Sequence, residues 1–332
     1  MGYDCTNHFP TGTKKKDVED FLLLLGYEKG QKGPFSGMSG TPYFFYDDKD
    51  YKHITGIYSE LIVDEETGEL RFWTRTTIWR SKFDSDFHNH TIKELKKRFG
   101  GYFVSDYGKN RYFKFDGPIR GKAEAGVYQS YGRFINNIKR AKHFTHFSDL
   151  NNNDKYPIQN IDFLDSMNPK LLATNVLVPY ILSAIEEFFR STYIALLKYS
   201  DNKENIIQNA RIQGAELLLI DQGVLTVPEA VAKWMNFQEM QKVNQAFKQL
   251  DKKIDLHGTL KKPYGRRKED FWSMLIRIIE LRHDIIHRAE MDTTYFPRNV
   301  ENDLKYVEKA IWRFYQHLVH TYKWNQVEEW EF

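Results

Sequence analysis

The chain has 332 residues, 41% of them hydrophobic and 28% charged, so it is long enough for one large or two ordinary domains, each with its own core. The net charge of +3 is only mildly basic, so binding of nucleic acid would have to depend on local patches. The single cysteine, Cys5, excludes an internal disulfide and any metal site built from several thiolates.

Residues 1 to about 120 have the pattern of an α+β domain. DVEDFLLLLG (17–26) predicts a short helix, because its acidic start suits the helix dipole and a glycine ends it. Three segments rich in β-branched and aromatic residues predict antiparallel strands: TPYFFYDD, HITGIYSELIVD and ELRFWTRTTIWR. FHNHTIKELKKRFGG (87–101) has helical spacing, and GYFVSDYGKNRYFKFDG (101–117) predicts a second hairpin. We expect this domain to sense a trigger, bind a partner or regulate the rest.

After Asp116 the spacing becomes helical. Residues 121–160 are expected to hold a connecting helix, VYQSYGRFINNIKRAKHF, and a loop, FSDLNNNDKYP. Residues 161–332 are expected to form an all-α domain. Its long helical segments pack as an antiparallel bundle, and they are ATNVLVPYILSAIEEFFRSTYIALLKYS, NIIQNARIQGAELLLIDQG, PEAVAKWMNFQEMQKVNQAFKQLDKKI, KEDFWSMLIRIIELRHDIIHRAE and NVENDLKYVEKAIWRFYQHLVHTYKW.

The segment ELRHDIIHRAE (280–290) concentrates reactive side chains at the end of an apolar helix. In an α-helix, Arg282 and His287 lie about 140° apart around the axis and about 7.5 Å along it, so they do not share a face. His283 and His287, four residues apart, do share one. A site that uses both Arg282 and His287 therefore gains from a second copy of the helix, which predicts a homodimer through residues 267–289 with a shared cleft.

At this point the sequence resembles a known family. Arg282-His283-Asp284-Ile285-Ile286-His287 is similar to the R-polar-x-x-x-H signature of HEPN domains. LVPYILSAIEEFFRSTYIALL resembles the opening helix of that family, and NVENDLKYVEKAIWRFYQHLV resembles its closing helix. The resemblance covers roughly residues 165 to 325 and leaves the first domain unassigned.

The resemblance implies a metal-independent endoribonuclease of a toxin, phage-defence or CRISPR-associated system, whose dimer pairs two such helices around one cleft. RNA supplies its own nucleophile, the 2′-hydroxyl, so histidine and arginine suffice for the chemistry. We assign His287 as general base or acid and Arg282 as the phosphate clamp, with His283 or Asp284 orienting them. Further RNA phosphates are expected to contact basic residues near the helix, namely Arg288, Lys261, Lys262, Arg266, Arg267 and Lys268.

No cofactor or metal is expected, and the implied partners are RNA, a second copy of the chain and an inhibitor or trigger that acts on the first domain. No segment approaches the ~18 consecutive apolar residues of a membrane helix, and the N-terminal residues lack the apolar stretch of a secretory signal, so we expect a cytoplasmic protein without membrane contact.

Two other functions remain open. The helical domain could be a non-catalytic module that binds RNA or protein through the same cleft. Alternatively, His283-Asp284-Ile285-Ile286-His287 is similar to the zinc helix HExxH with aspartate for glutamate, and this would make a zinc hydrolase with Glu290, His317 or His320 as third ligand.

Several other side chains allow two interpretations. Glu186 and Glu187, with Arg190, either reach the cleft from the opening helix or form a surface charge pair. Strand aromatics either stack on bases or pack in the core, and they are Phe44, Phe45, Tyr46, Phe72 and Trp73. His88 and His90 are expected at the surface.

Overall fold

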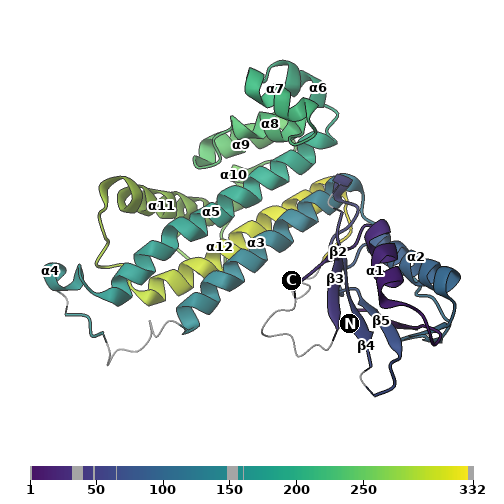
Figure 1. The fold of residues 1–332 in the computed structure, drawn as a ribbon. Helices are drawn as coiled ribbons and strands as arrows, with labels where there is room; N and C mark the ends of the chain where they lie inside the picture. Colours follow the sequence, from purple (N-terminus) through teal and green to yellow (C-terminus); the bar gives the residue numbers. More distant parts are fainter. Residues whose placement is uncertain are drawn as a thin grey trace. The chain divides into compact units, whose positions relative to one another are not determined.

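The structure is a computed structural model that describes residues 2–31, 40–47, 49–64, 66–147, 156–159 and 161–327. The chain divides into two compact units, Met1–Ala125 and Gly126–Phe332 (Figure 1). An antiparallel sheet in the first unit is followed by a largely helical second unit, which confirms the predicted order of an α+β part and an all-α part.

In the described part of the chain, seven strands form one antiparallel sheet in the order β2-β3-β4-β5-β1-β6-β7. Their bounds are β1 Asp4–His8, β2 Glu28–Lys29, β3 Thr41–Phe45, β4 Ile57–Val63, β5 Leu70–Arg75, β6 Tyr102–Ser105 and β7 Gly108–Lys109. The three predicted strands pair as β3-β4-β5, and the second predicted hairpin is β6-β7. The sequence prediction missed β1, which pairs with both β5 and β6 and so joins the two parts of the sheet.

Helices α1 (Lys15–Leu24) and α2 (Lys82–Phe99) pack on the sheet, and a 3₁₀ turn, η1 (Lys49–Tyr51), follows β3. One hydrophobic cluster joins Val18 and Leu22 of α1, Leu95 of α2 and the strand residues Tyr43 and Phe72. The aromatic residues divide between core and surface. Phe45 stacks on Phe87 with ring centroids 3.7 Å apart, and Trp73 is half-buried, whereas Phe44 and Tyr46 are exposed.

The start of α2 is fixed by a buried carboxylate. Asp84 accepts hydrogen bonds from the backbone N–H groups of Ser81, Ile54 and Gly56, and it lies 3.0 Å from Nδ1 of His53. This arrangement satisfies backbone donors at the helix start and ties the loop before β4 to α2. The prediction that His88 is a surface residue is wrong, because that ring is fully buried.

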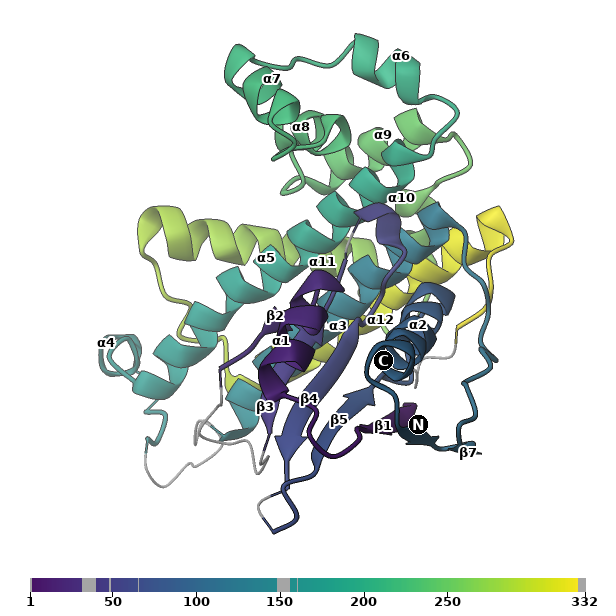
Figure 2. The same ribbon diagram turned by 45° about the vertical axis from the view of Figure 1, so that its right-hand side comes forward.

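The second unit contains the long helices α3 (Lys122–Phe147), α5 (Pro169–Lys198) and α12 (Pro297–Tyr322), which run side by side in Figures 1 and 2. Shorter elements complete it: α4 Asp162–Asp165, α6 Lys203–Gln208, α7 Gly214–Asp221, α8 Val227–Lys233, α9 Met240–Leu250, α10 Leu256–Lys261, α11 Phe271–His283 and η2 Asp284–Arg288. Aromatic rings form its core. Tyr131 stacks on Tyr315 at 4.8 Å, and Phe314 contacts Phe189 at 5.9 Å and Phe247 at 5.2 Å.

The helical unit differs from the sequence prediction in three ways. The segment expected as one helix over 205–223 is two helices, α6 and α7, and the segment over 228–254 is also two, α8 and α9. Besides connecting the units, α3 contributes Tyr131 and Phe134 to the core of the helical unit. Most of the predicted loop FSDLNNNDKYP, residues 148–155, lies outside the described residues.

Among the described residues, α5 is the helix long and apolar enough to cross a membrane. More than half of its apolar window, 56%, is buried inside the protein, as in the core helix of a soluble protein.

Candidate functional site

The predicted reactive residues lie where α11 ends. Asp270 caps the start of this helix, accepting hydrogen bonds from the backbone N–H of Ser273 at 2.8 Å and from its hydroxyl at 3.1 Å. One face of the helix is buried in the protein, and its residues include Phe271, Met274, Leu275 and Ile278. The buried residues end before the motif, so Arg282 and the residues after it project from the last turns of α11 toward solvent.

The motif itself is not a regular α-helix. Residues Asp284–Arg288 form a π-helical turn, in which the N–H of Ala289 donates to the carbonyl of Asp284, five residues earlier. A π turn rotates less per residue than an α turn, so residues five apart come closer to one face. His287 is therefore turned back toward the side of Arg282, and the offset between them is smaller than the ~140° of a regular α-helix.

Two side-chain pairs organise this turn. The rings of His283 and His287 lie 4.7 Å apart with an interplanar angle of 46°, which confirms that they share a face. Arg288 forms an ion pair with Asp284 at 3.1 Å. The imidazoles are exposed and the Asp284 carboxylate is partly exposed, so incoming phosphate or a second protein surface can reach all of them.

Arg282 contacts a loop residue that is itself hydrogen-bonded to α5. One guanidinium nitrogen lies 3.5 Å from Oε1 of Gln238, in the loop between α8 and α9. The amide of Gln238 in turn donates to Glu186 of α5 at 3.3 Å. The opening helix thus reaches the site through Glu186, while Glu187 pairs with Arg190 at 3.6 Å.

Gln238 was missed by sequence reasoning. It lies 44 residues before Arg282 in the chain, and no local spacing signals a contact of that range. Only the packing of the loop between α8 and α9 brings the two side chains together.

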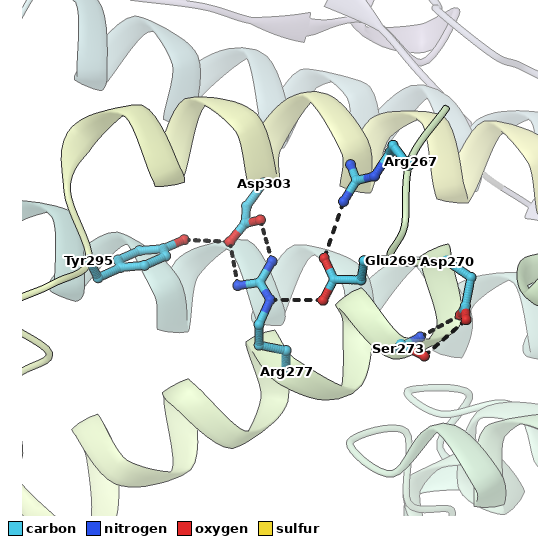
Figure 3. A network of polar contacts seen from close by, with 7 residues as sticks. All are labelled: Arg267, Glu269, Asp270, Ser273, Arg277, Tyr295 and Asp303. Carbon is cyan, nitrogen blue, oxygen red and sulfur yellow. Dashed lines mark hydrogen bonds and ion pairs between the residues drawn. The ribbon is translucent and has the colours of Figure 1, made fainter. Parts of the chain in front are cut away.

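A polar network shown in Figure 3 fixes α11 against α12. Arg277 donates two hydrogen bonds to the carboxylate of Asp303, at 3.1 and 2.6 Å, and a third to Glu269 at 3.1 Å. The hydroxyl of Tyr295 also donates to Asp303 at 2.8 Å. The hydrogen bonds that Arg277 donates to Asp303 are the main reason that the pKa of Arg277 is raised, so this ion pair holds the helix five residues before Arg282.

Of the basic residues expected to hold RNA, some form contacts within the protein and others have exposed side chains. Arg267 pairs with Glu269 at 3.2 Å and covers the ring of Tyr306 at 3.4 Å, and Lys261 pairs with Asp270 at 3.4 Å. The loop backbone is also anchored, since Arg313 donates to the carbonyl oxygen of Lys262. The exposed side chains that remain are those of Lys262, Arg266 and Lys268, which precede the start of α11 and so lie at the opposite end of this helix from Arg282 and His287.

The zinc interpretation lacks a third ligand in the described part of the chain, where no group of three histidine, cysteine or acidic side chains could hold a metal ion. His317 lies on α12, and its Nε2 accepts the backbone N–H of Asp255 at 3.2 Å. Nδ1 of His320 lies 2.6 Å from the carbonyl oxygen of Gln316. Both rings are engaged away from His283 and His287.

In comparisons with known proteins, no family model, no curated protein and no solved structure matches this chain.

Proposed function

We propose that the helical unit is a metal-independent endoribonuclease of the HEPN type, with Arg282 and His287 as its reactive pair. The observation that carries the proposal is the exposed π-helical turn at the end of α11. The turn and the last residues of α11 present two imidazoles with ring centroids 4.7 Å apart, and a guanidinium that is hydrogen-bonded to Gln238.

The residues can supply each step of RNA cleavage. An imidazole of His287 takes the proton of the 2′-hydroxyl, and the oxygen then attacks the adjacent phosphorus. Arg282 neutralises the charge that develops on the phosphate oxygens. A second imidazole, from His283 or from the paired copy, protonates the departing 5′-oxygen. The products are a cyclic phosphate, or the 3′-phosphate it hydrolyses to, and a 5′-hydroxyl end.

A single copy leaves the reactive groups on an open surface, which favours a site completed by a second copy. Ile286, between the two reactive residues, is 50% exposed, and an apolar side chain in that position gains from burial in an interface. Two copies of the turn related by a two-fold axis would place arginine and imidazole groups on both sides of one phosphate.

Purified protein incubated with total RNA in the presence of a chelator tests the enzyme. We expect cleavage by the unmodified chain, and loss of at least about a hundredfold in His287→Ala, because general acid–base catalysis contributes on that scale. Arg282→Ala is expected to lose activity as well, since it removes the charge at the phosphate. His90→Ala, which removes an exposed histidine from the sheet unit, is the matched control and should cleave normally.

Unchanged cleavage in both site variants, or cleavage that requires a divalent cation, would contradict the proposal. RNA that is bound but not cut by the unmodified chain would instead support the non-catalytic module. In cells, we expect the active protein to arrest growth, consistent with a toxin or antiviral role in the cytoplasm, and His287→Ala to relieve the arrest.

A further inference from the structure

A groove of about 930 Å³ lies between α6, α8 and α9. Figure 2 shows these short helices grouped together. The groove exists because the two segments expected as long helices are each broken in two. Its walls combine one large aromatic ring, carboxamides and cationic side chains.

The aromatic wall is Trp234. Its ring is 47% exposed, and its indole N–H donates to Oε2 of Glu216 at 2.7 Å. The other carboxylate oxygen of Glu216 lies 3.2 Å from the ammonium of Lys233. The edge of the indole is therefore fixed by a buried acid, while part of the ring remains accessible for stacking on a flat ligand.

The second wall is a row of asparagines. Asn202, Asn205 and Asn209 are spaced three and four residues apart, so they lie on one face of α6 and its ends. Each amide donates to the previous member of the row, Asn209 to Asn205 at 3.2 Å and Asn205 to Asn202 at 3.3 Å. The row ends where Asn202 donates to the carbonyl oxygen of Gln249 at 2.7 Å. Carboxamides held in this way offer donor and acceptor atoms of the kind that recognise base edges.

Cations outnumber acids in the groove. Lys248 forms an ion pair with Asp255 at 3.4 Å. The carboxylate of Asp251 accepts a hydrogen bond from the hydroxyl of Tyr322 at 3.1 Å. Arg211 and Lys252 are exposed, and the structure records no ion pair for either among the described residues. Both side chains are thus available to a phosphate.

We propose that this groove binds a nucleotide of single-stranded RNA, and that the strand continues from it to Arg282. Trp234 and Met235 line the groove, and Gln238, four residues from Trp234, contacts Arg282. Four residues of chain span at most roughly 14 Å, about the length of four stacked nucleotides. The inference rests on the proposed ribonuclease function and extends it, since it makes the substrate single-stranded on one side of the cut.

Fluorescence anisotropy with a short, labelled single-stranded RNA of mixed sequence tests the groove. All proteins carry His287→Ala, so that the probe remains intact. We expect Trp234→Ala to weaken binding about tenfold and Trp234→Phe to restore most of it, because stacking needs only an aromatic ring. Lys252→Glu should weaken binding by a similar factor and lower the salt dependence by about 0.7 in the log–log slope. Lys253→Glu makes the same charge change at the next residue, outside the groove, and should bind as the parent does.

The outcomes separate the groove from the catalytic site. The inference is overturned if the parent protein, which carries only His287→Ala, does not bind the RNA. It is also overturned if Trp234→Ala and Lys252→Glu bind as tightly as Lys253→Glu. Both results count against the groove even where the unmodified chain cleaves RNA. Loss of binding in those two variants, with no cleavage by the unmodified chain, would support the groove and contradict the nuclease. If free adenosine or uridine monophosphate competes with the labelled RNA as well as an unlabelled RNA strand does, the ligand of the groove is a free nucleotide. That result would overturn the inference that the groove binds an RNA strand.

Discussion

His88 is a base held neutral inside the sheet unit. Its Nε2 lies 2.7 Å from the hydroxyl of Thr74, and its ring stacks on Phe113 with centroids 4.9 Å apart. Burial, with a smaller contribution from the charge of Arg80, lowers the pKa of His88 to about 3. This histidine therefore belongs to the packing of α2 on β5.

The depressed pKa of His88 makes the stability of the sheet unit depend on pH. Below pH ~6.5 the unfolded chain binds a proton at His88 that the folded chain does not, so stability is full above that pH and falls as the pH decreases toward 3. The slope contributed by this residue approaches ~1.4 kcal/mol per pH unit. We expect the amide protection of β1 and β5 in hydrogen exchange, corrected for intrinsic rates, to fall between about pH 6.5 and about pH 4.5.

The variant His88→Gln is the control for this pH dependence, because it keeps a polar partner for Thr74 and cannot be protonated in that range. Its protection at neutral pH is expected to be lower, but it should change less on acidification. Parallel pH profiles for the two proteins would show that other groups cause the loss of stability.

At the scale of elements, α11 and the π turn η2 carry ion pairs of different kinds. The pair between Arg277 and Asp303 joins α11 to α12, and the side chain of Asp303 is only 6% exposed. The pair between Asp284 and Arg288 lies on the exposed π turn, with side chains 42% and 60% exposed. A carboxylate left buried without its partner lowers the stability of the fold strongly, whereas an exposed ion pair contributes little to that stability.

We predict that Arg277→Ala lowers the unfolding free energy by about 2 kcal/mol, because Asp303 would retain Tyr295 as its only neutral partner in the network of Figure 3. Arg288→Ala should change it by less than about 0.5 kcal/mol. Urea titration of both variants measures the difference. Equal effects would mean that the network with Asp303 does not anchor the helix.

The broken helices explain both a failure of sequence reasoning and the origin of the groove. The hydrophobic spacing over 205–223 and 228–254 continues through the breaks, so periodicity alone predicts single long helices. The interruptions are stabilised by side chains that accept backbone N–H groups at the breaks. Before α7, Glu216 accepts the N–H of Gln213 at 3.0 Å, and between α8 and α9, Oδ1 of Asn236 accepts the N–H groups of Gln238 at 2.8 Å and Glu239 at 3.2 Å. The first of these is a capping box that the sequence shows, but the prediction did not weigh it against the longer periodicity.

For the molecule as a whole, the sequence predicted those elements whose pattern is strong and local. The strands β3 to β6 and the helices α5, α11 and α12 have clear periodicity or β-branched and aromatic content. The interior strand β1 has neither, because Asp4, Thr6 and His8 alternate with Cys5 and Asn7, and the strand forms only by pairing with β5 and β6. The π turn was also unpredictable from spacing, although it changes the relation between Arg282 and His287.

A site shared by two copies of the molecule makes its own prediction. If Arg282 of one copy acts with His287 of the other, a heterodimer of Arg282→Ala and His287→Ala contains one complete pair, although neither homodimer does. We expect the two inactive variants, unfolded and refolded together, to recover cleavage of RNA. The variants refolded separately and then assayed side by side are the control for contamination. If both residues act within one chain, the mixture remains inactive, and the π turn would then form the reactive pair without a second copy.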